Sequence, residues 1–246
     1  MVVRFGGVKG RDSLTGGRDG DKILAACSAA LGTDPVRAMK GGHPFHFWNR
    51  SGKSSLFQAL FRCVDLEWGS IMYGELDISQ IDLKLYRSHL AFIPQTPFLY
   101  CGTLRENLDI TGTCSTEQLL AAAHKAHLEN VMYRLGGLDG VLGEGGGDIS
   151  AGERQLICLA RVLLSPAQIV CIDEATAKVD PETDAAIQRT LREAFPDRTL
   201  LVIAHRLQTV SDMDRILLMK DGQLYADGPP KKLFAGLGFN DLETLL

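Results

Sequence analysis

The sequence contains no apolar run long enough to cross a membrane. A transmembrane helix needs about 20 mostly apolar residues, and the 246 residues hold no such run. The N-terminus also lacks the apolar core of a signal peptide. We therefore expect any membrane role to come through transmembrane domains that are attached to this chain or belong to a partner.

Paired cysteines and an excess of positive charge are also lacking. The six cysteines are scattered and form no CxxC pair, so the sequence indicates neither a zinc site nor a disulfide framework. A reducing setting is therefore expected. The net charge of −4 gives no electrostatic reason to expect a nucleic acid as partner.

Residues 6–44 contain no phenylalanine, tyrosine or tryptophan. Glycine pairs begin at positions 6, 16 and 41, and no period of 2 or 3.6 residues runs through the segment. From Ser51 onward the chain is patterned throughout. We therefore predict a domain over residues 51–246, preceded by a segment 1–50 of different character.

Several helices are predicted in the patterned part. The run SSLFQALFRCV places Leu56, Leu60 and Cys63 on one side of a helix. Ser115 and Gln118 have the spacing of a capping box, which predicts the start of a second helix, rich in alanine and leucine.

Two short apolar runs predict strands. AQIVCID at 167–173 and TLLVIAH at 199–205 are rich in β-branched residues, as is typical of strands buried on both faces. Between them, Asp180 and Pro181 indicate a helix cap and a first-position proline. RILLMKDGQLYADG at 215–228 predicts a hairpin around Asp-Gly. Strand, helix, strand and hairpin indicate an α/β fold with a mainly parallel core sheet.

The stretch SGKSS at 51–55 is the first candidate site. In a phosphate-binding loop, GxxxxGK[ST], backbone N–H groups and a lysine surround the phosphates and the next hydroxyl holds Mg²⁺. Lys53 and Ser54 occupy these two positions, but Phe47 stands where the pattern has its first glycine. Taken alone, SGKSS is more often an ordinary start of a helix.

The second candidate is the carboxylate pair at the end of the predicted strand 167–173. In α/β folds, ligands bind at the carboxyl ends of strands. Asp173 could hold Mg²⁺, directly or through water, and Glu174 could orient or deprotonate an attacking water. Alone, the pair also fits a strand that meets a polar loop. Together with Lys53 upstream, it indicates a phosphoryl-transfer site.

The third candidate is the glycine-rich stretch EGGGDISAGERQ, which begins at residue 144. Ser150 and Glu153 have capping-box spacing, which would explain them as structural residues. Glycines before a capped helix also expose free N–H groups to an anion. The two interpretations are compatible.

These motifs, in this order, resemble the nucleotide-binding domain of ABC transporters. ISAGE at 149–153 is similar to the LSGGQ signature of that family, and Gln95 in FIPQ corresponds to the glutamine of the Q-loop. ATAKVD and AHR place Asp180 on the D-loop aspartate and His205 on the switch histidine. PFLYCGTLRENLD and GGLDGVLGEGGGDISAGERQLICLARVLL look like the second nucleotide-binding half of a subfamily C exporter, the multidrug-resistance-associated type.

The resemblance implies a P-loop NTPase fold of ABC type, with a helical subdomain at about 97–165 that carries the signature motif and a C-terminal β-hairpin. It also implies ATP and Mg²⁺ as cofactors, and ATP hydrolysis that powers export. Two such domains would close head to tail over two ATP molecules, so that Ser150 and Gly152 touch ATP held mainly by the other half. The transmembrane domains of an exporter would hold the chain at the cytoplasmic face of a membrane.

Residue roles are implied as well. Glu174 would activate water and His205 would contact the γ-phosphate, which makes these two the catalytic residues. Ser54, Gln95 and Asp173 would serve Mg²⁺. The expected ATP-binding residues are Ser51, Gly52, Lys53, Ser54, Ser55, Gln95, Ser150, Gly152, Glu153 and Asp180.

The resemblance fails before Ser51. Phe47 and Arg50 replace glycines of the loop, and no aromatic residue that could stack on adenine stands at the expected distance upstream. Two explanations are open: a frameshift or wrong exon in the gene, and true divergence of the protein. If Arg50 has a CGN codon, a one-base loss near codon 50 could conceal GTGSGKSS.

Two other functions are open. The chain could be an incomplete or inactive fragment that binds ATP weakly and does not hydrolyse it. It could also be a soluble ABC protein that acts on ribosomes. Members of that branch carry two such domains in one chain, usually with charged insertions, whereas this chain has one domain and no charge run.

Overall fold

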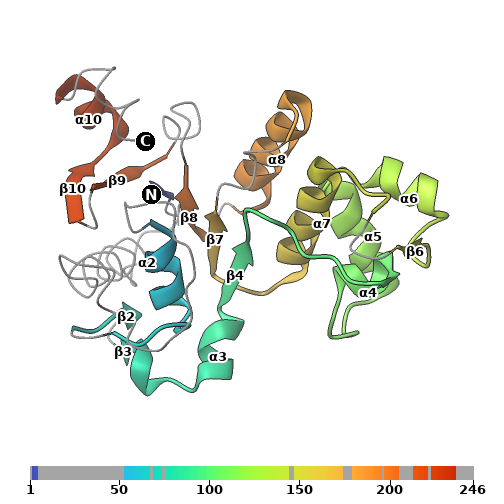
Figure 1. Cartoon of the computed structure of the whole chain (residues 1–246), viewed down its shortest axis with the longest axis horizontal. Coiled ribbons are helices and arrows are strands. Elements are labelled where there is room, and N and C mark those ends of the chain that lie inside the picture. Colours follow the sequence, from blue (N-terminus) through green and yellow to red (C-terminus); the bar gives the residue numbers. More distant parts are fainter. Residues whose placement is uncertain are drawn as a thin grey trace. The chain divides into compact units, whose positions relative to one another are not determined.

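The computed structural model describes residues 2–4, 53–66, 69–73, 76–143, 147–173, 179–195, 197–204, 213–220 and 223–236. The chain divides into two compact units (Figure 1). The first unit contains Met1–Leu90 and Asp197–Leu246, and the second contains Ala91–Pro196.

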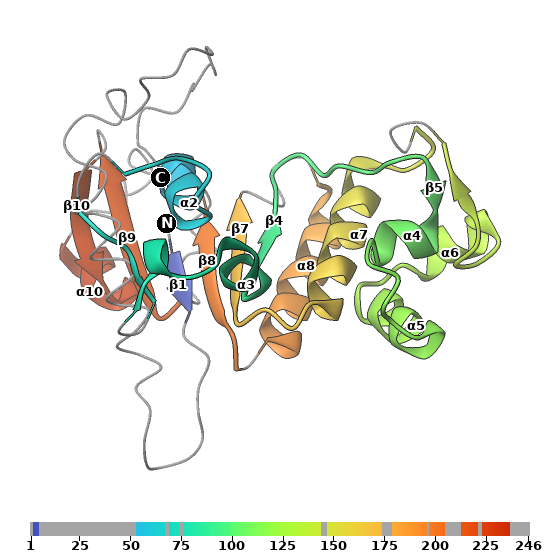
Figure 2. The same ribbon diagram turned by 90° about the horizontal axis from the view of Figure 1, so that it is seen from below.

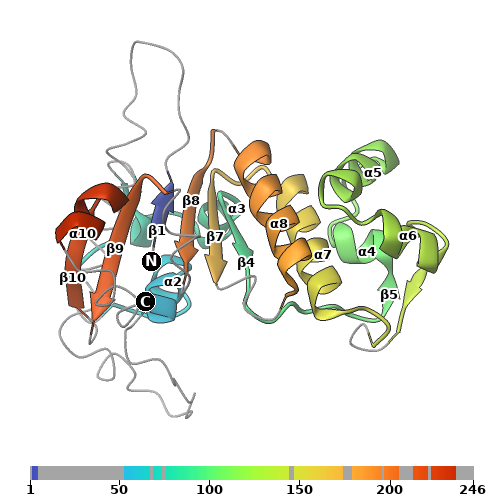
Figure 3. The ribbon, with the colours of Figure 1, turned by 90° about the horizontal axis from the view of Figure 1, so that it is seen from above.

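The first unit contains four neighbouring strands that pair antiparallel. These strands, in order across the sheet, are β10 (Gln223–Gly228), β9 (Arg215–Lys220), β1 (Val2–Arg4) and β8 (Thr199–Ile203) (Figure 3). The register of β1 on β8 pairs Val3 with Leu201. Helix α10 (Pro230–Gly236) lies beside β10. Leu200 to Ile203 in β8 are all buried, which confirms the strand predicted from TLLVIAH.

The predicted C-terminal hairpin is confirmed. β9 and β10 pair antiparallel, with an irregularity between Leu224 and Ala226. A double hydrogen bond joins the strands, since Arg215 Nε donates to Asp227 Oδ1 at 2.6 Å and Nη2 donates to Oδ2 at 2.5 Å. The Asp-Gly turn at 221–222 lies outside the described residues.

Helix α2 (Lys53–Leu60) follows the candidate phosphate-binding stretch. Leu56 and Leu60 are 4% and 1% exposed, as their predicted common face requires. The placement of Cys63 on that face was wrong, because the helix ends at Leu60 and Cys63 is exposed. The physical reason is the left-handed conformation of Arg62, whose φ of 52° cannot continue a right-handed helix.

A second helix, α3 (Leu83–Ser88), holds the end of α2. The hydroxyl of Tyr86 donates to Leu60 O at 2.8 Å, and Arg87 Nε donates to Phe61 O at 2.9 Å. The last carbonyls of a helix have no partner within it and favour a nearby cation. These two side chains therefore fix the helix whose other end carries Lys53. Between α2 and α3 lie β2 (Met72–Tyr73), β3 (Leu76–Asp77) and the 3₁₀ turn η1 (Ile78–Gln80).

Two neighbouring strands enter the second unit. β4 (Leu90–Ile93) and β7 (Ile169–Asp173) lie side by side and point the same way (Figure 2). Residues 169–172 are buried, which confirms the strand predicted from AQIVCID. Because the strands are parallel, their carboxyl ends meet at one edge.

Helices make up most of the second unit. They are α4 (Leu104–Leu108), α5 (Thr116–Lys125), α6 (Glu129–Leu135), α7 (Ala151–Leu164) and α8 (Pro181–Ala194). The unit also contains a short antiparallel strand pair, β5 (Gly102–Thr103) with β6 (Val141–Leu142). The capping box predicted at Ser115 and the proline start predicted at Pro181 are both confirmed.

Helix α7 forms the core of the second unit. It packs against α4, α5 and α8, and Ile157 and Leu159 are fully buried. Each such side chain contributes roughly 1.5–3 kcal/mol through burial. At its far end, Arg161 Nη1 donates to Phe98 O at 2.9 Å and Nη2 donates to Asn107 Oδ1 at 3.2 Å. This arginine thus ties α7 to α4 and to the segment before it.

Candidate functional site

Four of the predicted site residues lie outside the described part of the chain. They are Ser51, Gly52, Glu174 and His205. Lys53 and Ser54 are the first two residues of α2, and Ser55, which follows them, is half-buried. The described backbone therefore begins α2 at the lysine, as the loop-to-helix prediction requires.

Two predicted Mg²⁺ ligands lie at one edge of the second unit. Asp173 is the last residue of β7 and is half-buried after four buried residues. Gln95 is exposed and follows Ile93, the last residue of β4, by two positions. Mg²⁺ is a hard cation that binds oxygen ligands, usually one or two carboxylates together with waters and phosphate oxygens. Asp173 and Gln95 are thus donors of the right kind at the carboxyl edge, where α/β folds bind ligands.

A residue that sequence reasoning missed anchors Gln95. Gln155 in α7 is 3% exposed, and its Nε2 donates to Pro94 O at 3.1 Å and to Gln95 O at 3.2 Å. Its Oε1 is buried without a hydrogen-bond partner among the described residues. A buried polar side chain with this pattern fixes the backbone of Gln95 to α7.

The start of α7 is a complete capping box. Ser150 Oγ accepts from Glu153 N at 3.2 Å, and Glu153 Oε2 accepts from Ser150 N at 2.9 Å. This confirms the predicted box. It also leaves the N–H groups of Ala151 and Gly152 without an acceptor inside the helix.

Gly152 and Asp180 come together in the second unit. A Cβ atom at Gly152 would lie 3.3 Å from Thr183 Cγ2, 3.4 Å from Val179 Cγ1 and 3.5 Å from Asp180 Oδ2. Asp180 in turn caps α8, since Oδ1 accepts from Thr183 N at 3.0 Å. The absence of a side chain at Gly152 lets the start of α7 approach the start of α8 closely. The structure thus brings together two residues predicted from separate motifs.

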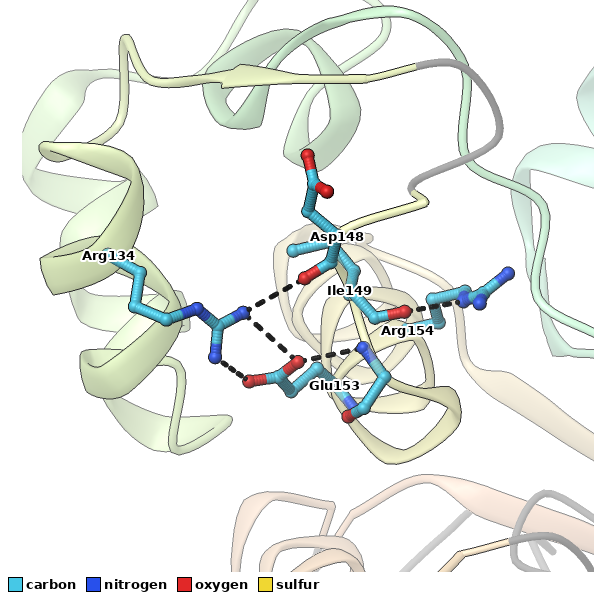
Figure 4. A network of polar contacts seen from close by, with 6 residues as sticks. Arg134, Asp148, Ile149, Glu153 and Arg154 are labelled. Carbon is cyan, nitrogen blue, oxygen red and sulfur yellow. Dashed lines mark hydrogen bonds and ion pairs between the residues drawn. The ribbon is translucent and has the colours of Figure 1, made fainter.

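Glu153 makes a second contact that the sequence did not suggest. Arg134, in the last turn of α6, binds its carboxylate with both guanidinium ends, Nη1 to Oε1 at 2.6 Å and Nη2 to Oε2 at 3.2 Å (Figure 4). The hydrogen bond from Arg134 lowers the pKa of Glu153 below its usual range, although burial raises it. Glu153 is therefore ionised at neutral pH. No sequence pattern links positions 134 and 153.

The loop before α7 is held by two arginines. Arg134 Nη2 donates to Asp148 O at 3.3 Å, and Arg154 Nε donates to Ile149 O at 3.1 Å (Figure 4). Both carbonyls precede the capping residue. The direction from which the chain enters α7 is thus set by side chains on α6 and on α7 itself.

Other features of the described residues lie apart from these. A cavity of about 510 Å³ in the second unit lies at the C-terminal ends of α5 and α8, with Lys125 and Arg189 in its wall, and includes none of the predicted site residues. In the described part of the chain, no cluster of three or more His, Cys, Asp and Glu side chains could hold a metal ion. No described helix has the length and apolar character needed to span a membrane.

Comparison with known proteins gives consistent matches. The family model described as "ABC transporter" matches residues 48–177. "ATP-binding cassette sub-family C member 10" of Mus musculus is 48% identical over 183 residues, which are 74% of this chain and 12% of that protein. "ATP-binding cassette transporter abc2" of Schizosaccharomyces pombe is 46% identical over 184 residues, again 74% of this chain and 12% of that protein.

A solved structure is similar as well. "Structure of a bacterial Atm1-family ABC exporter with ATP bound" matches with a TM-score of 0.71 at 34% identity, over 76% of this chain and 33% of that chain. The chain thus spans 12% of the length of these two curated relatives and a third of the solved chain.

Proposed function

The chain belongs to the ABC transporter family, and we propose that it is an ATP-binding and ATP-hydrolysing module that powers export across a membrane. The resemblance predicted from the motifs is confirmed, including the likeness to sub-family C, and so is the α/β fold of ABC type. The observation that carries the proposal is the family match over residues 48–177, which contains Lys53, the signature-like stretch and Asp173.

Lys53 is proposed to bind the phosphates together with the backbone amides of 51–55. Its support is its place as the first residue of α2, where N–H groups without helical partners favour an anion. Ser54, Gln95 and Asp173 are proposed to hold Mg²⁺, which would offset the charge of the phosphate oxygens. The oxygen donors and the position of Asp173 at the end of a buried strand support this set.

Glu174 and His205 are proposed as the catalytic residues. Glu174 would accept a proton from the attacking water, and His205 would contact the γ-phosphate. Proton transfer by a positioned carboxylate contributes about 10²–10⁴-fold to rate. The support is the place of both residues in the family's motif order, IVCIDE and AHR.

A second nucleotide-binding domain is the proposed partner, closing head to tail with this one over two ATP molecules. ATP held mainly by the other half would then contact Ser150, Gly152 and the two N–H groups at the start of α7 that have no acceptor inside the helix. Asp180 supports this arrangement through its closeness to Gly152. Transmembrane domains of an exporter are the further partner, and they would hold the chain at the cytoplasmic face of a membrane.

We also propose the domain limits predicted from the sequence. Residues 51–246 would form the nucleotide-binding domain, with its helical subdomain at about 97–165. Residues 1–50 would be a segment altered by a frameshift, a wrong exon or divergence. The start of the family match at residue 48 supports this boundary.

Glu174→Gln and Lys53→Ala test the proposed roles. Phosphate release by the chain would be measured at saturating MgATP, together with MgATP affinity. We expect Glu174→Gln to slow hydrolysis by about 10²–10⁴-fold and to keep nucleotide binding, because glutamine keeps the shape but not the basic carboxylate. Lys53→Ala should weaken binding itself.

The opposite pattern would contradict the assignment. If Glu174→Gln hydrolyses ATP at the parent rate, Glu174 has no catalytic role. If the parent binds MgATP but releases no phosphate, the chain is the inactive fragment described by the alternative function.

A further inference from the structure

The signature-like stretch of this chain ends in an acid. The family pattern LSGGQ has a neutral glutamine at the position of Glu153. Glu153 is the third residue of α7 and places a carboxylate within the first helical turn. A negative charge there stabilises the helix, because it faces the positive end of the helix dipole. The same charge repels an anionic ligand at the same helix end.

Burial does not remove this charge. Glu153 has 19% of its side chain exposed, and its pKa is lowered by Arg134, so the carboxylate stays ionised at neutral pH. The negative charge must therefore be offset by a neighbour if an anion is to bind at the start of α7.

Arg134 is placed to offset it. Its guanidinium binds both oxygens of Glu153, at 2.6 and 3.2 Å, in the planar two-bond geometry that makes arginine–carboxylate pairs strong (Figure 4). The helix that carries Arg134 ends one residue later, where Gly136 takes the left-handed conformation with a φ of 80°. Gly136 thus lets the chain turn away just after the arginine.

The pair also fixes which oxygen caps the helix. Glu153 Oε2 accepts from both Arg134 Nη2 and Ser150 N, and Arg134 Nη2 reaches Asp148 O as well. With Glu153 turned onto Ser150 N, the N–H groups of Ala151 and Gly152 remain available.

We propose that Arg134 is a positioning residue that neutralises Glu153 and holds it in the capping box, so that the start of α7 can receive the triphosphate of ATP held by a second domain. The inference rests on the proposed function. It names a residue outside the signature stretch on which that site depends in this chain.

An experiment with a double variant distinguishes an electrostatic role of Arg134 from a purely structural one. Arg134→Met keeps most of the apolar stem of the side chain but removes the charged guanidinium group. Glu153→Gln removes the opposing charge and keeps an oxygen that can accept from Ser150 N, as glutamine does in other capping boxes. ATP-dependent association between copies of the chain would be measured by sedimentation in the Glu174→Gln background, for the parent, both single variants and the double variant.

We expect Arg134→Met to weaken association by about tenfold, the size of one uncompensated charge near the ligand. Adding Glu153→Gln should restore association to at least the parent level. The defect of Arg134→Met should also shrink between 0.1 and 1 M salt, because the screening length falls from about 10 to about 3 Å. Arg105→Met removes a similar pair, Arg105 Nε to Asp139 Oδ1 at 2.8 Å, and is the matched control without this salt-dependent defect.

Several results would overturn the inference. If the double variant associates as weakly as Arg134→Met, the pair only holds α6 against α7. The same conclusion follows if the association defect of Arg134→Met does not change with salt. Parent-like association of Arg134→Met would refute the inference as well. MgATP affinity of the separate chains is measured alongside: loss of both binding and association in Arg134→Met indicates general damage and refutes the specific role. A parent that binds no MgATP would instead overturn the proposed function.

Discussion

Single residues at the start of α7 and α8 combine structural and proposed functional roles. Ser150 and Asp180 cap their helices through hydrogen bonds to N–H groups three residues on, at 3.2 and 3.0 Å. Both were recognisable in the sequence, because a capping residue is defined by its own local spacing. The proposed role of these two residues in ATP binding does not follow from the capping hydrogen bonds, but it is compatible with them.

Gly152 should tolerate little added volume. Gly152→Val would push branches into Thr183 Cγ2 and Val179 Cγ1, which lie 3.3 and 3.4 Å from the first added carbon. Overpacking of this kind typically costs about 1–3 kcal/mol. We expect a loss of that size in the free energy of unfolding, measured by urea titration.

The control for this variant is Ala151→Val in the same helical turn, at an exposed position. A surface substitution usually changes stability by less than about 0.5 kcal/mol. Equal losses in the two variants would show that valine at the helix start, and not the contact with α8, is responsible.

Gln155 and Arg134 show where prediction from sequence stops at the residue scale. Gln155 bonds to carbonyls about sixty positions away, and Arg134 bonds to Glu153 across a loop. Hydrogen-bond partners of this kind depend on how the helices pack in space. Neither residue belongs to a local sequence pattern that would predict its partner. The sequence indicated a helix start at Ser150 but not what holds the helix in place.

At the scale of elements, helix α2 also has features that the sequence predicts and features that it does not. Its position after SGKSS and its buried face at Leu56 and Leu60 were predictable from the apolar period. Its end was not, because Arg62 adopts a left-handed conformation that no glycine or proline signals. The carbonyl oxygens of Leu60 and Phe61, at its end, accept hydrogen bonds from Tyr86 and Arg87 of α3, which lie 26 positions further along the chain.

Removal of the Tyr86 hydroxyl should weaken α2. Tyr86 is 2% exposed, and its hydroxyl bonds to Leu60 O at 2.8 Å. Tyr86→Phe would leave a carbonyl unsatisfied in the core, which costs about 1–3 kcal/mol. We expect a loss of this size in unfolding free energy, and faster amide exchange in the last turn of α2.

Tyr133→Phe is the control, since Tyr133 is 89% exposed and should lose little. If exchange in α2 is unchanged in Tyr86→Phe, the hydroxyl does not hold the helix that carries Lys53. The bond would then be incidental to the placement of the candidate phosphate-binding residue.

At the scale of the whole molecule, the family and the α/β fold were predictable from motif order, because several short motifs at consistent spacing constrain one fold. The strands at 169–173 and 199–203 were predictable from short apolar runs rich in β-branched residues, and the hairpin after them from its Asp-Gly turn. What precedes Ser51 was not, since that segment has no pattern to interpret. Of residues 1–50 the structure describes only β1.

The altered segment before Ser51 has a consequence for nucleotide affinity. A stacked aromatic contributes about 1–3 kcal/mol to base binding, and each 1.4 kcal/mol is about tenfold in affinity. Without such a residue at 6–44, and with Arg50 in place of a loop glycine, the chain should bind ATP about ten- to a hundredfold more weakly than a domain with an intact loop.

The measurement that tests the central claim most directly is the affinity of the chain for MgATP, by titration calorimetry, beside that of Lys53→Ala. The account predicts weak but saturable binding to the parent. Lys53→Ala should lower it by about ten- to a hundredfold, because a hydrogen bond to a charged group is worth about 1.5–3 kcal/mol. Absence of binding, or binding that is indifferent to Lys53→Ala, would contradict the claim that this chain is an ATP-binding module.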